Sequence, residues 1–140
     1  MISTRGVQQE TVRLYYLYVA TLTESNLYYI DYLPRIKDYY YFDLYIKFIN
    51  QALERWDMPD GLTEKHHIVP KCYLPNWMTI EETFKRNMVV LTSHEHYIAH
   101  YYLARALGGK MEAAFKRMSY NSKYNTAIFP ADECVSDFLR

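Results

Sequence analysis

The chain has 140 residues, half of them apolar, with 16 basic and 16 acidic side chains. That length fits one domain, or a small catalytic unit with an accessory segment, and the apolar content is enough to bury a core, which argues against wholesale disorder. The sequence contains no run of about 18 uncharged apolar residues, which argues against a membrane span. Residues 1–10 also lack the order of a signal peptide, so we expect an intracellular, cytoplasmic protein.

The charge is unevenly distributed along the chain. Residues 61–125 contain nine Lys/Arg against five Asp/Glu, a net charge of +4, whereas residues 1–60 and the remaining tail each have a net charge of −2. All five histidines lie in the basic part. Positive charge beside a histidine cluster favours a phosphate-bearing partner, although the excess is small for tight binding of nucleic acid.

The N-terminal half is predicted to be helical. Apolar residues recur at three- and four-residue steps over 7–22 and again over 39–56, and a shorter helical piece is expected at 27–33, where Pro34 ends it. A turn at 58–61 closes this half. The 16 tyrosines of the chain have two interpretations, which are packing in and around the core, or stacking on nucleic-acid bases.

After that turn the pattern changes to mixed strand and helix. A short strand is expected at 66–69, stopped by Pro70, and a second strand at 88–92, where β-branched residues concentrate. The connection over 71–86 is expected to be a long loop with one helical turn around 80–84.

Two helices are expected beyond the second strand. Thr92 and Glu95 have the spacing of a capping box, which predicts that a helix begins at residue 92 or 93. Leu107 should end it, because a pair of glycines follows. A further helical stretch is expected over 110–120.

The histidines have the spacing of a metal site. His96 and His100 are four residues apart, so on a helix they lie on one face, whereas His94 is about 200° from His96 around the helix axis and is expected on the surface. His66 and His67 are adjacent on a strand and must face opposite sides of it. They cannot do the same work, and one can bind metal while the other faces an attacking water.

Phosphodiester hydrolysis uses this division of labour. A divalent cation screens the phosphate charge and stabilises the leaving oxygen, while an imidazole with a pKa near about 6.5 takes a proton from water. The histidines therefore indicate a hydrolytic metal site.

Three blocks of the sequence, in this order, resemble the HNH (ββα-metal) endonucleases, and most closely the small bacteriophage proteins that include homing-type nucleases. They are EKHHIVPK (64–71), RNMVVLT (86–92) and EHYIAH (95–100). The double histidine and the final His-x-x-x-His also resemble the colicin-type DNases. The resemblance covers about residues 61–107. It implies a mainly helical α+β fold, with a Tyr-rich helical segment (1–60) packed on a ββα-metal unit (61–109) and followed by a C-terminal helix and tail (110–140).

The resemblance also implies roles for individual residues. His67 would be the general base that activates water, His66 and His96 metal ligands, and His100 a third ligand or a phosphate contact. Asn87 would tie the loop across the two strands and orient His67, or it would bind the metal, as the corresponding Asn does in some branches of the family. Apart from the resemblance, an Asn at this position can also simply form a hydrogen bond within a turn. The basic residues that flank the site would hold the DNA backbone without reading its sequence, namely Lys65, Lys71, Lys85 and Arg86.

The sequence departs from the family pattern in two ways. It lacks the paired Cys-x-x-Cys zinc knuckles of many relatives, since its two cysteines, Cys72 and Cys134, are far apart and read as reduced thiols. The N-terminal helices must then brace the fold. Where many relatives carry Asp, this chain has His66, and an all-imidazole site widens the plausible metals to Mg, Mn, Zn, Ni or Co.

These implications predict a metal-dependent endonuclease that nicks or cuts DNA, encoded by a phage or mobile element and acting in the host cytoplasm. RNA is a variant substrate for the same chemistry, and a homodimer or a partner protein would supply missing contacts. Two other classes stay open. One is a non-catalytic, metal-stabilised nucleic-acid-binding module, which would not need His67, and the other is a phage interaction protein that works through its Tyr-rich half.

Overall fold

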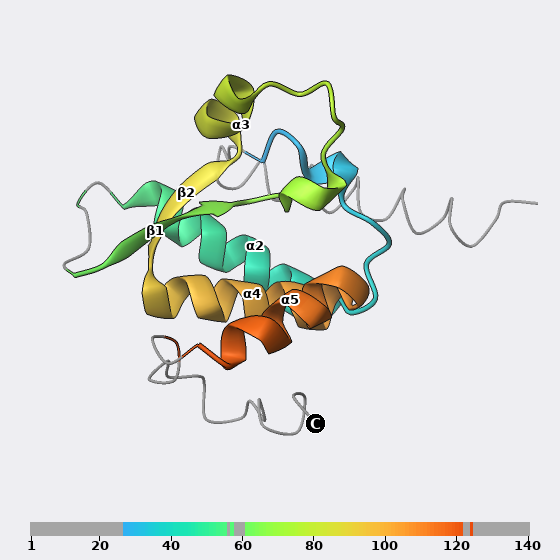
Figure 1. Cartoon of the computed structure of the whole chain (residues 1–140), viewed down its shortest axis with the longest axis vertical. Coiled ribbons are helices and arrows are strands. Elements are labelled where there is room, and N and C mark those ends of the chain that lie inside the picture. The colour runs from blue at the N-terminus through green and yellow to red at the C-terminus, as the bar shows by residue number, and fades with distance from the viewer. Residues whose placement is uncertain (1–26, 56, 58–60, 122–123, 125–140) are drawn as a thin grey trace, which may run out of the picture.

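The computed structural model of the chain describes residues 27–55, 57, 61–121 and 124. This part is a mainly helical α+β structure with one two-stranded antiparallel sheet. Figure 1 shows the strand pair lying over helices α2, α4 and α5, with α3 on the opposite side of the strands. The elements in chain order are η1 (Ile30–Tyr32), α2 (Tyr39–Glu54), β1 (Thr63–His67), η2 (Lys71–Tyr73), α3 (Ile80–Arg86), β2 (Met88–Thr92), α4 (Ser93–Leu107) and α5 (Gly109–Ser119).

Helix α2 confirms the helix predicted over 39–56. Asp38 caps it, because its carboxylate accepts hydrogen bonds from the backbone N–H groups of Tyr40 (3.0 Å) and Tyr41 (3.3 Å). Its apolar face is buried against α4 and β2. Upstream of α2, the piece expected at 27–33 is reduced to the three-residue η1, and the helix predicted over 7–22 lies outside the described residues.

Strands β1 and β2 pair in antiparallel register, with His67 opposite Met88. The second strand has the predicted bounds, whereas the first was expected at 66–69 and that expectation is wrong at both ends. Strand β1 begins earlier because each of its five residues faces one residue of β2. Side chains alternate along it as expected, so that His66 is 2% exposed and His67 is half-buried.

Asn87 explains why β1 ends where it does. This residue precedes β2, and its carbonyl accepts the N–H of Ile68 at 2.9 Å while its side chain bonds Val69. The backbone at Ile68 and Val69 therefore bonds to one residue and leaves the ladder instead of continuing as strand. In the connection between the two strands, helix α3 is longer than the single turn expected, and Thr79 caps its N-terminus.

Helix α4 confirms the capping box and both predicted ends. The Thr92 hydroxyl accepts the N–H of Glu95 at 3.1 Å, and the Glu95 carboxylate accepts the N–H of Thr92 at 2.8 Å. Arg55, directly after α2, donates to both carboxylate oxygens of Glu95, each at 2.8 Å, and to the carbonyl of Val90. The end of α2 is thus fastened to the start of α4.

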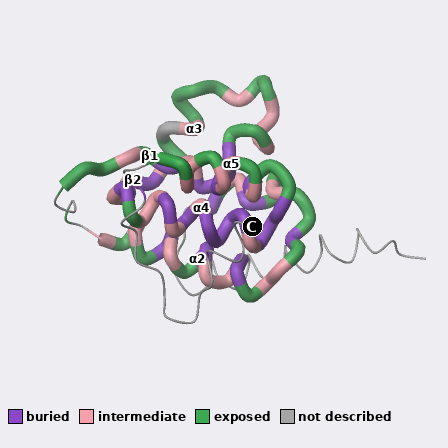
Figure 2. Tube along the Cα trace, turned by 60° about the horizontal axis from the view of Figure 1, so that its bottom comes forward, coloured by how far each residue is buried: buried purple, intermediate pink, exposed green. Residues whose placement is uncertain are grey.

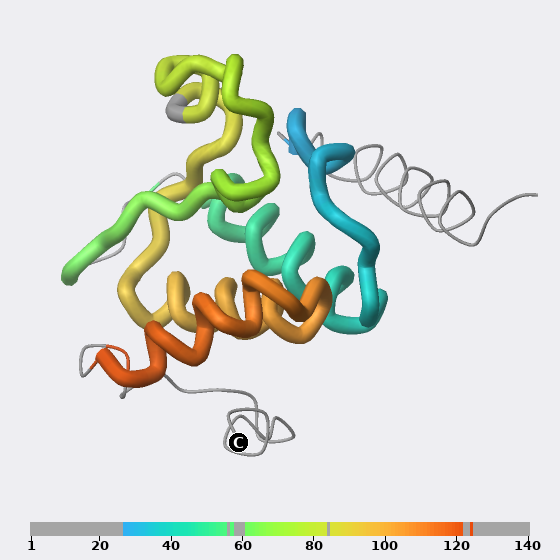
Figure 3. Tube along the Cα trace, turned by 45° about the vertical axis from the view of Figure 1, so that its right-hand side comes forward, coloured from blue at the N-terminus to red at the C-terminus, as the bar shows by residue number. Residues whose placement is uncertain are grey.

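At its other end α4 stops at Gly108, whose φ of +65° is one that residues with a side chain rarely adopt. Helix α5 then follows and packs along α4, which confirms the predicted helical stretch over 110–120. Figure 3 shows α5 running beside α4 from this turn.

The core lies between α2, α4 and the sheet, where the buried segments gather in Figure 2. Five tyrosines of α2 and α4 are buried, which supports the packing interpretation for these five: Tyr41, Tyr45, Tyr97, Tyr101 and Tyr102. Among the described residues, none of the helices combines the length and apolar character that crossing a membrane requires.

Candidate metal centre and adjoining pocket

Three histidines from two elements converge at one point beneath the sheet. His66 comes from β1, and His96 and His100 come from successive turns of α4. One ring nitrogen from each lies within 4.8 Å of the others, and the ring centroids are 4.8 to 5.2 Å apart. The three side chains can therefore hold one metal ion between them. His94 is exposed, as expected.

The packing of α4 fixes the two helical histidines. Leu103 and Leu107 continue the same helical stripe and are buried, as the periodicity predicted. The capping box at the other end, with Arg55 on Glu95, holds the turn from which His96 projects. The helix is thus held on both sides of the cluster.

The hydrogen bonds of His66 determine which of its nitrogens is free. Its Nε2 lies 2.8 Å from the hydroxyl of Tyr45, and that hydroxyl donates to the carbonyl of Ile68 at 2.6 Å. Burial raises the pKa of Tyr45 well above its usual range, so the phenol keeps its proton. Its single hydrogen is used on Ile68, so His66 Nε2 must donate, and Nδ1 carries the lone pair.

His96 has the opposite arrangement. Its Nδ1 lies 2.8 Å from a carboxylate oxygen of Glu64, which also accepts hydrogen bonds from Ser93 at 3.2 Å and Tyr124 at 2.9 and 3.1 Å. A carboxylate accepts, so Nδ1 of His96 donates, and Nε2 is the nitrogen left to bind a metal. This is the carboxylate–histidine pairing that commonly orients a metal ligand.

The donor set fits a metal ion. The Nδ1 atoms of His66 and His100 are buried and have no hydrogen-bond partner in the described part of the chain, a costly state that a metal would relieve. Burial, with the neighbouring imidazoles, lowers the pKa of His66 well below its ordinary value and that of His100 to about 4. Both rings are therefore neutral at pH 7, the form that binds metal.

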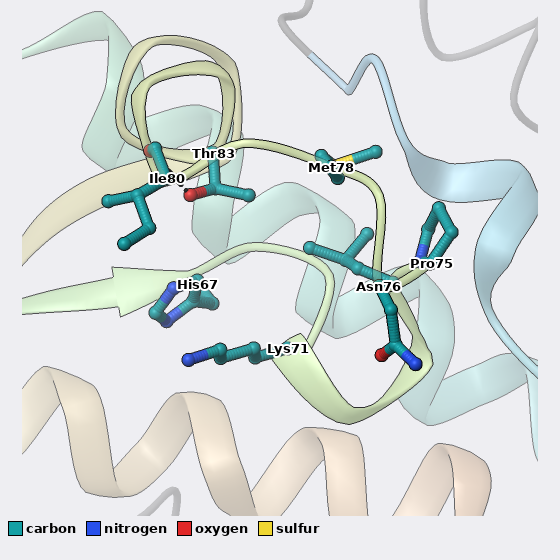
Figure 4. A pocket seen from close by; sticks show the side chains of 8 residues that line it. His67, Lys71, Pro75, Asn76, Met78, Ile80 and Thr83 are labelled. Carbon is teal, nitrogen blue, oxygen red and sulfur yellow. Dashed lines mark hydrogen bonds between the residues drawn. The ribbon is translucent and has the colours of Figure 1, made fainter.

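His67 lies on the other face of β1, in an open pocket of about 370 Å³. Burial, then the charge of Lys71 and then His96, lower the pKa of His67. Figure 4 shows His67 and Lys71 together below Ile80 and Thr83 of α3. Loop residues complete the lining: Leu74, Pro75, Asn76 and Met78.

Asn87 is 1% exposed and makes two hydrogen bonds to the same residue across the sheet. Its Oδ1 accepts the N–H of Val69 at 2.9 Å, and its Nδ2 donates to the carbonyl of Val69 at 2.8 Å. The expected tie across the two strands is therefore present, and it holds the chain two residues after His67. Neither of these two bonds reaches His67 itself.

The four basic residues expected on the DNA backbone are all exposed. Lys71 lines the pocket beside His67. Lys85 pairs with Glu81 of its own helix at 3.0 Å, and the Arg86 guanidinium lies 5.3 Å from the ring centroid of Tyr28. Lys65 is absent from the pocket lining.

The two residues that bond to His66 and His96, namely Tyr45 and Glu64, were not predicted from the sequence. Glu64 could have been found, because residues two apart on a strand share a face, which places its side chain beside that of His66. Tyr45 lies 21 positions before His66, on helix α2, and no local pattern connects the two.

Comparison with protein-family models gave no match, and the curated proteins and the solved structures gave none either. The functional interpretation of the chain therefore depends on the residues and geometry described above.

Proposed function

We propose that this protein is a metal-dependent endonuclease of the HNH (ββα-metal) type that hydrolyses DNA phosphodiester bonds. One observation carries the proposal. Three imidazoles, of which those of His66 and His100 are neutral at pH 7, converge from β1 and α4, while the adjacent residue of the same strand, His67, faces an open pocket with a lysine beside it. A protein that used metal only to brace its fold would have no need of this fourth histidine.

The residues of the chain divide the work between them. His66, His96 and His100 hold the metal, which when bound supplies Lewis-acid stabilisation of charge on the phosphate and leaving oxygen. His67 accepts a proton from the attacking water, and its lowered pKa keeps it neutral and ready to do so at pH 7. Lys71 contributes positive charge beside it, which attracts a phosphate and lowers that pKa.

Asn87 keeps the pocket in shape by holding the chain directly after β1. Lys65, Lys85 and Arg86 would contact backbone phosphates farther from the site and increase affinity without selecting sequence. The metal is one of Mg, Mn, Zn, Ni or Co. A three-imidazole set favours the borderline metals Zn, Ni and Co, and Mg depends more on oxygen ligands. A homodimer or a partner protein would add contacts that the small positive excess of this chain lacks.

The experiment separates metal binding from catalysis with four proteins. Wild type, His67→Ala, His100→Ala and His94→Ala are tested for conversion of supercoiled plasmid to nicked or linear form with each of the five metals, and for metal affinity. We expect His100→Ala to lose both metal and cleavage, and His67→Ala to lose only cleavage. His94→Ala is the matched control, an exposed histidine on the same helix, and should retain both.

Two outcomes would overturn the proposal. If wild type binds metal but cuts neither DNA nor RNA with any of the five, the protein is a metal-stabilised binding module. If His67→Ala cuts as fast as wild type, the general base lies elsewhere.

A further inference from the structure

Tyr45 connects the helical segment outside the HNH resemblance to the candidate metal centre. It lies on α2, its side chain is fully buried, and its ring stands edge-on to His66 with the centroids 6.0 Å apart. Its hydroxyl bridges His66 Nε2, at 2.8 Å, and the carbonyl of Ile68, at 2.6 Å. The resemblance begins near residue 61, so it assigns nothing to this tyrosine.

The hydroxyl determines where the proton of His66 must be. The Ile68 carbonyl can only accept, so the one hydrogen of the phenol is on that bond. The phenol oxygen then accepts from His66, whose Nε2 carries the N–H. A neutral imidazole has a single N–H, so Nδ1 keeps its lone pair, and this is the buried nitrogen for which the described residues provide no hydrogen-bond partner.

We propose that Tyr45 is a positioning residue that holds His66 as its Nε2–H tautomer and so keeps Nδ1 free to bind the metal. The inference rests on the proposed metal centre. Glu64 has the matching effect on His96, where Nδ1 donates and Nε2 is free. The two ligands are thus fixed through opposite nitrogens, one by a phenol of α2 and the other by a carboxylate of β1.

Removing the hydroxyl would leave the Nε2–H of His66 buried without an acceptor. The ring would then turn or shift its proton to Nδ1, and either change competes with metal binding. Outer contacts of this kind typically change metal affinity by about 10- to 100-fold when they are lost. The packing of α2 would in this way set the metal affinity of a site to which it gives no ligand.

The first test compares Zn²⁺ affinity in wild type, Tyr45→Phe and Tyr97→Phe at neutral pH, by competition with a chromophoric chelator. Tyr97→Phe is the control, because it also deletes a buried tyrosine's hydroxyl, here one bonded to Ser119 at 2.6 Å. We expect Tyr45→Phe to bind about 10- to 100-fold more weakly, and the control to stay within about twofold of wild type. A purely structural role would lower the stability of both variants and leave the Zn²⁺ affinity of the folded protein unchanged.

The second test reads the tautomers directly, by ¹⁵N NMR of the metal-free wild type, and does not depend on the folding of any variant. We expect His66 to carry its proton on Nε2 and His96 on Nδ1. A proton on Nδ1 of His66 overturns the inference, as does equal Zn²⁺ affinity in Tyr45→Phe and wild type. Wild type that binds none of the five metals would overturn the proposed function as well, so the two failures are distinguishable.

Discussion

The amide of Asn87 is expected to stabilise the sheet without binding the metal, and Asn87→Ala separates these two roles. Its two hydrogen bonds, 2.9 and 2.8 Å long, both go to the backbone of Val69 in a buried position. An alanine leaves one N–H and one carbonyl of Val69 without their partner. Each unpaired buried group costs about 1–3 kcal/mol, so the free energy of unfolding should fall by about 2–6 kcal/mol. A water that enters the space left by the amide would bring the loss toward the lower value.

The assay for this prediction has two readouts on the same samples. Urea unfolding measures the stability loss, with Asn76→Ala, an exposed position, as the control that should change by less than about 0.5 kcal/mol. Titration of the folded protein with Zn²⁺ measures metal affinity, which should stay within about threefold of wild type, because neither described bond of Asn87 reaches the three histidines. A stability loss under about 1 kcal/mol would refute the stabilising role, and a tenfold drop in metal affinity would assign Asn87 to the metal.

The other predictions concern pH and the two ends of helix α4. The metal-free protein should lose about 2 kcal/mol of stability from His100 alone as pH falls from 7.5 to 5. The imidazole of His100 binds a proton below about pH 6.5 in the unfolded chain, but only near pH 4 in the folded protein. Urea unfolding in the presence of a chelator checks this, and stability that rises on acidification would contradict it. Arg55→Met should lower the free energy of unfolding by about 1–2 kcal/mol, because it removes a bidentate contact with Glu95. The control Lys47→Met, which breaks an exposed ion pair, should lower it by under about 0.5 kcal/mol. Equal losses would show that the Arg55 contact is no stronger than a surface pair. Gly108→Ala should lower the free energy of unfolding by about 1–3 kcal/mol, because a φ of +65° with a ψ of −153° is a conformation that almost only glycine adopts. An unchanged thermal midpoint would contradict this.

Much of the secondary structure could be predicted because its signals are local. The capping box of Thr92 and Glu95, the glycines after Leu107 and the β-branched run at 88–92 each act within a few residues, and the structure confirms all three. The first strand was misplaced because its length depends on pairing with β2, and its end depends on the bonds that Asn87 makes across the sheet. Such bonds become visible only when the partner strand is in place.

In the candidate site too, the local relations could be predicted and the contacts between distant elements could not. Spacing alone grouped His96 with His100 and separated His66 from His67, because helices and strands have fixed periods. Glu64 was within reach of the same rule. The contact from Tyr45 was not, because it depends on how α2 packs against β1, which no spacing within the sequence encodes.

The division of the three imidazoles between β1 and α4 has a consequence for the unfolded chain. An ion held by His66 and His100 would close a loop of 35 residues, much as a covalent crosslink does. If loop closure is treated as it is for a disulfide, the lost entropy of the unfolded chain corresponds to about 4 kcal/mol. The ion would then be a removable crosslink in a chain whose two cysteines stand far apart in sequence. Chelation would then loosen the attachment of β1 to α4.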